Sequence, residues 1–414
     1  MLIKRESRTN TMLIEILLAL IIGIIIGSIS GITPGIHINL ISAMLLSFSA
    51  FLMTRFEIPP LAMVVFLVSI AMTHTFVDFV PSIFLGAPDE DSALSILPGH
   101  EFLLEGKAYQ AVVYTLYGGL TAILIILLFS PIFFFFLPKI YPYAVRIMPY
   151  ILILTSIFLI YTEKTSRIWA IIIFGLSGLL GIVTMSIPMK ESLLALFTGL
   201  FGISSLITSI AKKQKIPEQK TSRLKTIKIG HKSLLKSICA STIASPLCSF
   251  LPGMGSGQAA IIGSEILGDL NRKEFLILLG SINTIVTGLS FVTLYAIGKA
   301  RTGVAVAVEK LMELKFSDLW IITAAIVISS IAAFFISLYI AKGFSKFIYK
   351  INYKILSISI ILFLLIINYI FSGFLGLLIL VTATLIGLTC IYAGIRRTHL
   401  MGCLLIPTIL IYLI

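Results

Sequence analysis

The chain has 414 residues, of which 58% are hydrophobic and 12% are charged, and its formal net charge is +13. Apolar runs recur along the whole length, which excludes a soluble globular protein and predicts an all-α, polytopic helical membrane protein in the cell membrane. The Lys and Arg residues gather in short loops between these runs. There they set the membrane topology and contact the lipid bilayer, so the net positive charge does not indicate nucleic acid as a partner.

The apolar runs are long enough to span a bilayer at many places. In the first half they fall at about 12–30, 36–53, 59–85, 109–137, 143–161, 167–187 and 191–210. In the second half they fall at about 232–250, 256–269, 274–298, 317–341, 353–371, 373–394 and 399–414. Some runs are short or broken, so about 12–14 membrane segments are expected. The second run of each half is either a half-helix or a re-entrant hairpin.

The order of motifs predicts two homologous halves, residues 1–211 and 232–414, joined by a linker at 212–231. Pro34-Gly35 in the first half corresponds to Pro252-Gly253 in the second, and the bend at Gly86 corresponds to the bend at Gly298. An internal duplication accounts for these matches in one order. The linker is rich in Lys, which places it in the cytoplasm by the positive-inside rule.

The basic N-terminal residues also favour the cytoplasm, but seven crossings in the first half would separate the two ends. Either one run is therefore re-entrant or the N-terminus lies outside.

The most specific local signal is the stretch 251–258 between two apolar runs. Pro and adjacent Gly break a helix and leave backbone groups without partners, which a bilayer tolerates only inside protein or beside a watery cavity. Two such breaks, one per half, are typical of a transporter binding site. The candidate substrate-binding residues at the two breaks are Pro34, Gly35, His37, Asn39, Pro252, Gly253, Gly255, Ser256 and Gln258.

At the second break we expect Ser256 to cap the next helix, whose N–H groups would face an anion, and Gln258 to donate to the same ligand. The alternative is close helix packing through small residues.

Placing an ionisable residue inside a membrane segment costs free energy, so each such residue indicates a structural or functional role. His74 and Asp78 lie in an apolar run, and Asp89, Glu90 and Asp91 follow the break after Gly86. We expect these five to couple transport to an ion, binding Na⁺ or exchanging protons. The alternative for the three consecutive acids is a solvated turn that caps a helix.

The equivalent bend of the second half carries Lys299, Arg301 and Thr302 in place of the acids. A guanidinium near a helix break suits a carboxylate or phosphate, although a snorkelling anchor or an ion pair with the other half are alternatives. Asn283 and Thr284 lie on an apolar helix, where they line the pathway or bond neighbouring helices.

Enzyme chemistry is not predicted. The four cysteines lack metal-ligand spacing, and no catalytic or nucleotide-binding motif is present, so neither a metal nor a cofactor is expected beyond Na⁺ as a coupling ion. We expect a secondary-active permease for a small organic anion. The alternatives are a lipid-phosphate translocase and, more remotely, an intramembrane enzyme using His74, Asp78 and His100.

Several motifs resemble one known family. They are Gly31-x-x-Pro34-Gly35, Ser82-Ile83-x-Leu85-Gly86-x-Pro88, Leu97-Pro98-Gly99-His100 and Phe250-Leu251-Pro252-Gly253-x-Gly255. Together they are similar to the large permease subunit of tripartite tricarboxylate transporters, the TctA family, of which this chain resembles a divergent short member. The resemblance implies transport of di- or tricarboxylates driven by an ion gradient. It also implies a small membrane subunit and an extracytoplasmic binding protein as partners, and a homo-oligomer is a further possibility.

Overall fold

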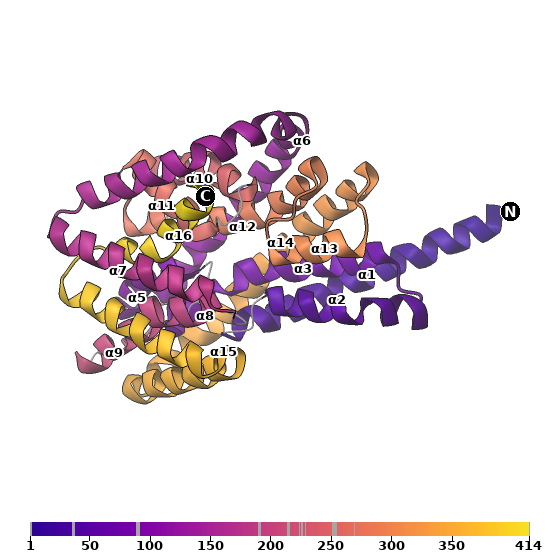
Figure 1. Ribbon diagram of the computed structural model, residues 1–414. Helices are drawn as coiled ribbons and strands as arrows, with labels where there is room; N and C mark the ends of the chain where they lie inside the picture. The colour runs from indigo at the N-terminus through magenta and orange to yellow at the C-terminus, as the bar shows by residue number, and fades with distance from the viewer. Residues whose placement is uncertain are drawn as a thin grey trace.

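The computed structural model describes residues 2–34, 38–87, 92–188, 192–212, 216–222, 224, 227, 229–250, 255–268 and 270–413 (Figure 1). No strand occurs among these residues. The helices of the first half are α1 (Leu2–Ile32), α2 (Ile38–Arg55), α3 (Pro60–Val77), α4 (Phe79–Leu85), η1 (Ala93–Ser95), α5 (Ile96–Leu104), α6 (Ala108–Tyr161), α7 (Arg167–Ser186), α8 (Ser192–Phe197), the π-helix η2 (Thr198–Ile203) and α9 (Ser204–Ala211). Those of the second half are α10 (His231–Phe250), α11 (Ser256–Leu267), α12 (Arg272–Ile297), α13 (Gly303–Leu311), α14 (Phe316–Phe347), η4 (Ile348–Lys350), α15 (Tyr353–Tyr392), η5 (Arg397–Met401) and α16 (Gly402–Leu413).

The predicted polytopic helical membrane protein is confirmed. Nine helices of the described chain are long and apolar enough to cross a bilayer. Two of them, α6 and α15, each cover two of the predicted runs, and both are bent. Gly373 has non-helical backbone angles inside α15, and α6 turns back near its label in Figure 1. The bend of α6 follows from interior prolines, which remove helical hydrogen bonds, at Pro131, Pro138, Pro142 and Pro149.

Three shorter apolar helices complete the set, at Ile41–Arg55, Ala93–Leu104 and Arg397–Leu413. The second run of the second half is a half-helix, because the 12 residues of α11 extend only about 18 Å. The bent and short helices together explain why nine long helices correspond to more predicted segments.

Each half of the chain contains a pair of closely packed parallel helices. In the first half α1 runs parallel to α3, with Gly23 against Ser69 and the Ser30 hydroxyl 3.0 Å from Nδ1 of His74. In the second half α10 runs parallel to α12. There the Ser237 hydroxyl donates to the Glu274 carbonyl and the Ser281 hydroxyl donates to that of Ser241, both over 2.9 Å. These interlocking small residues let the helix backbones approach closely.

The two bends also match. Gly86 ends α4 with φ 66° and ψ 25°, and Gly298 ends α12 with φ 61° and ψ 31°. Both are left-handed caps whose N–H bonds a carbonyl four residues earlier, a conformation that favours glycine. The preceding segments, Pro60–Leu85 and Arg272–Ile297, are each 26 residues long.

The two helix pairs run in opposite directions. Gly99 of α5 packs against Ile83 of α4, and Glu101 of α5 accepts a hydrogen bond of 3.1 Å from Arg272, the first residue of α12. The end of α4 therefore lies at the same end of the molecule as the start of α12. Because α1 runs parallel to α3 and α4, and α10 runs parallel to α12, α1 and α10 begin at opposite ends of the molecule. The linker meets the α10 end, where Lys220 donates to the Gly106 carbonyl over 2.8 Å. If the linker is cytoplasmic as predicted, the N-terminus therefore lies outside.

The centre of the molecule is formed by α3 and α12. Nearly all of their side chains are buried, whereas α1, α7 and α15 expose many large apolar side chains that face lipid. A membrane helix enclosed by protein on all sides can carry polar residues, because other helices bond them. The candidate site residues fall on these central helices and on the short helices beside them.

Candidate functional site

The second break leads into a buried helix start. Gly255, not Ser256, is the N-cap of α11, so the predicted cap is wrong by one residue. The backbone of Gly255 is extended (φ −116°, ψ −174°), whereas Ser256 is already the first residue of the helix. The side-chain oxygen of Gln258 accepts a hydrogen bond of 2.9 Å from the Gly255 N–H, as the third residue of a capping box does. Pro252 and Gly253 lie outside the described residues.

The structure brings two predicted residues together at this helix start. The Ser256 hydroxyl is 3.5 Å from the side-chain oxygen of Asn283 on α12, and the two residues are 2% and 1% exposed. Thr284, which follows Asn283 in the sequence, is also buried. Its hydroxyl, however, donates to the Gly280 carbonyl of its own helix. The arrangement places a positive helix end and two polar side chains in the core, which is chemistry suited to an anion.

The first break lies against the second half of the chain. Pro34 is partly buried after α1, and Gly35 and His37 lie outside the described residues. Asn39, in the first turn of α2, packs so closely against Gly303 that a Cβ on that glycine would overlap its side chain. Thr302 caps α13 by accepting a hydrogen bond of 3.1 Å from the Ala305 N–H. Two helix starts, one from each half, therefore meet at this point.

Arg301 is held beside this contact by an aromatic ring from the bend of α6. Its Nη2 donates to the Tyr141 hydroxyl over 2.8 Å, and its guanidinium carbon lies 5.3 Å from the ring centroid. Lys299 bonds the same hydroxyl over 3.4 Å. Among the residues that the structure describes, no carboxylate lies within 4.0 Å of Arg301. The alternative of an ion pair with the first half is thus not found in that part of the chain.

His74 and Asp78 lie one turn apart in the centre of the molecule. They are 4% and 3% exposed. Asp78 stands at the junction of α3 and α4, where its backbone carbonyl accepts a hydrogen bond of 2.9 Å from Ser82. Buried ionisable groups at a helix junction suit an ion-coupling role. Asp89, Glu90 and Asp91 fall outside the described residues.

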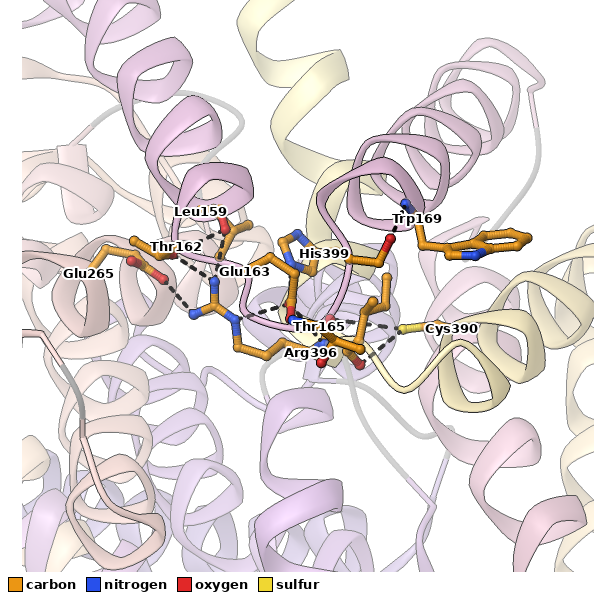
Figure 2. A network of polar contacts seen from close by, with 11 residues as sticks. Leu159, Thr162, Glu163, Thr165, Trp169, Glu265, Cys390, Arg396 and His399 are labelled. Carbon is orange, nitrogen blue, oxygen red and sulfur yellow. Dashed lines mark hydrogen bonds and ion pairs between the residues drawn. The ribbon is translucent and has the colours of Figure 1, made fainter.

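A second polar cluster was missed by the sequence reasoning (Figure 2). It joins the α6–α7 loop to the α15–α16 loop through Glu163, which is 6% exposed. The Glu163 carboxylate receives hydrogen bonds from the Thr165 N–H (2.9 Å), the Arg396 N–H (3.2 Å) and Nε (3.3 Å), and His399 Nε2 (2.8 Å). Burial alone would raise the pKa of Glu163, but these donors hold it at about 2.

The same cluster reaches the short helix of the second break. Arg396 also lies 3.4 Å from Glu265 near the end of α11, and it donates to the Leu159 carbonyl and the Thr162 hydroxyl. The cluster thus fixes the far end of the helix whose start is the candidate anion site. The side chain of Glu265 is only 14% exposed.

Arg397 is anchored differently from its neighbour. Its guanidinium is buried and donates to the carbonyls of Leu200 (2.9 Å) and Phe201 (3.0 Å) and to the hydroxyls of Ser204 and Ser205. The carbonyls belong to η2, a π-helix, a form that is frequent at functional sites. In the sequence, such loop arginines indicate only the topology. The sequence feature that could have indicated this network is Glu163, a single acidic residue between two apolar runs.

Two comparisons relate the chain to known proteins. A family model described as the tripartite tricarboxylate transporter TctA family matches residues 17–402. A protein of Methanocaldococcus jannaschii, named as uncharacterized, is 34% identical over 396 residues, which is 92% of this chain and 94% of the relative. No solved structure matches the chain.

Proposed function

Because the chain belongs to the tripartite tricarboxylate transporter TctA family, we propose that it is a permease that carries a small organic anion, bound at the start of α11. The family and the membrane helices support a transport role in the cell membrane rather than an enzymatic one. The substrate class that we propose is a di- or tricarboxylate. The proposed partners are a small membrane subunit and an extracytoplasmic binding protein.

The observation that carries the proposal is the buried start of α11. The first hydrogen bond within this helix runs from the Ala259 N–H to the Gly255 carbonyl, over 3.3 Å. The N–H groups of Ser256 and Gly257 come before it and have no acceptor within the helix. A helix start carries roughly half a positive charge, and its effect is stronger in a protein core than in water. The amide of Asn283 stands beside it to orient a carboxylate.

The contact between α2 and α13 supports a second part of the binding site. We propose that Arg301 and Thr302 bind another carboxylate of the substrate, with Asn39 and the first break beside them. Arg301 suits this role because, among the residues that the structure describes, its guanidinium donates to a neutral group, the Tyr141 hydroxyl, and to no carboxylate. His74 and Asp78 are proposed to bind Na⁺ or exchange a proton.

We also propose that the two halves are inverted repeats. The parallel pairs α1–α3 and α10–α12, the left-handed caps at Gly86 and Gly298, and the opposite directions of the two sets support this division. In such a repeat, each broken helix of one half lies near the other half, as α2 lies against α13.

The test is uptake of radiolabelled di- and tricarboxylates into proteoliposomes under an imposed Na⁺ or pH gradient. Asn283→Asp adds a negative charge beside the α11 start and should reduce uptake roughly tenfold or more, the factor for about 1.4 kcal/mol. Thr287→Val changes a buried polar residue one turn along the same helix and serves as a matched control that should retain uptake.

Both variants should elute as monodisperse protein in detergent. Wild-type uptake by Asn283→Asp would refute the assigned site. Transfer of a labelled phospholipid between leaflets, without uptake of any soluble anion, would instead favour the lipid-phosphate translocase.

A further inference from the structure

An open apolar groove lies at the linker end of the molecule. It runs between the end of α14, η4 and the start of α15, and its volume is about 760 Å³. Its apolar walls include Leu85, Tyr339, Phe347 and Ile351. The end of α14 lies beside the end of α4, because the rings of Phe84 and Phe344 are 5.6 Å apart. The groove is therefore at the same end as the start of α12 and the basic linker.

The rim of the groove is positively charged. Lys342 and Lys346 line it, and because they are four residues apart on α14 they lie on one face of the helix. Both are exposed, and Lys350 follows one turn later, 5.8 Å from the Phe347 ring centroid. In the described part of the chain no carboxylate lies within 4.0 Å of these lysines. An uncompensated positive rim beside an apolar trough is complementary to a phosphate attached to a hydrocarbon chain.

Gly343 stands between the two lysines, in the wall of the groove. A Cβ added there would meet no other atom within 4 Å, so no neighbouring helix requires a glycine at this position. A glycine inside a helix is about 1 kcal/mol less favourable than alanine. By contrast, Gly181 on α7 is required, because a Cβ there would overlap the backbone of α16. Glycine at position 343 widens the groove, and no contact with a neighbouring helix requires a glycine there.

We propose that this groove binds an anionic phospholipid. One acyl chain lies along Tyr339, Phe347 and Ile351, over the space left open by Gly343, and the phosphate lies between Lys342 and Lys346. The bilayer supplies this ligand at high local concentration, and a basic juxtamembrane face attracts anionic headgroups most strongly on the cytoplasmic side. That is the side to which the Lys-rich linker assigns this end of the molecule.

The test is native mass spectrometry of delipidated protein in detergent, titrated with phosphatidylglycerol or phosphatidylcholine. The wild type should retain one phosphatidylglycerol more tightly than phosphatidylcholine. Gly343→Leu fills the groove and should abolish this preference, with an affinity loss of roughly tenfold, equal to about 1.4 kcal/mol. Gly175→Leu is the matched control, because Gly175 lies within α7, away from the groove, and its Cβ would also meet nothing within 4 Å. The control should bind as the wild type does.

The charge is tested separately with Lys342→Gln/Lys346→Gln. Phosphatidylglycerol should bind about fivefold more weakly for each lysine removed, with phosphatidylcholine unchanged. Thermal unfolding checks that the variants fold. Equal binding of the two lipids to the wild type would overturn the proposal, as would undiminished binding to Gly343→Leu. A photo-crosslinker at position 343 that captured the small membrane subunit or a second copy of this chain in place of lipid would also overturn it.

Discussion

Glu163→Gln tests whether the missed polar cluster stabilises the fold through an ionised carboxylate. The glutamine keeps the shape of the side chain but removes its charge and places an amide nitrogen among hydrogen-bond donors from Thr165, Arg396 and His399. Hydrogen bonds to a charged acceptor are about twice as strong as neutral ones. We therefore expect a less stable protein at neutral pH.

The magnitude follows from the pKa of Glu163, which falls from 4.5 to about 2 in the folded protein. Each unit corresponds to about 1.4 kcal/mol, so the ionised carboxylate contributes on the order of 3 kcal/mol. Because the folded pKa is lowered, this contribution is present above the unfolded pKa. It is lost as the pH falls from about 5 towards 2.

The assay is thermal unfolding in detergent at a series of pH values, comparing wild type with Glu163→Gln. The difference in midpoint should be on the order of 5 °C at neutral pH and should shrink steadily below about pH 5. Glu309→Gln, which changes an exposed acid on α13, should show no such difference. If the wild type and Glu163→Gln differ equally at neutral and acid pH, or do not differ at all, the carboxylate is not held ionised by this cluster.

Three further changes test other parts of the molecule. Gly280→Ala should be strongly destabilising in thermal unfolding, because its Cβ would overlap the backbone of α6, whereas Gly175→Ala on the open face of α7 should be neutral or stabilising. Arg397→Gln should lower stability by about 2 kcal/mol or more, since the π-helical carbonyls lose their donor, and unfolding in denaturant measures this. Tyr141→Phe should leave the fold intact but reduce carboxylate uptake severalfold, because Arg301 loses the hydroxyl that positions it; unchanged uptake would argue against that role.

The sequence by itself determined the class of protein, most helices and the places where helices break. Hydrophobic runs of bilayer length are a local property, so the membrane class needs no knowledge of packing. The bends at Gly86 and Gly298 were also readable, because a left-handed cap favours one residue type wherever it occurs. The pairing of Ser256 with Asn283 was not readable, since it depends on how α11 lies against α12.

Only the tertiary structure decided which polar residues come together. Glu163 and Arg396 are separated by more than half of the chain, and each looks like an ordinary loop residue until the α6–α7 and α15–α16 loops meet. The direction of α10 relative to α1 was likewise undecided, because the positive charges favoured the cytoplasm for both the N-terminus and the linker, whereas seven crossings would separate the two. Contacts between distant helices settle such questions, since a bilayer requires buried polar groups to find partners wherever the fold provides them.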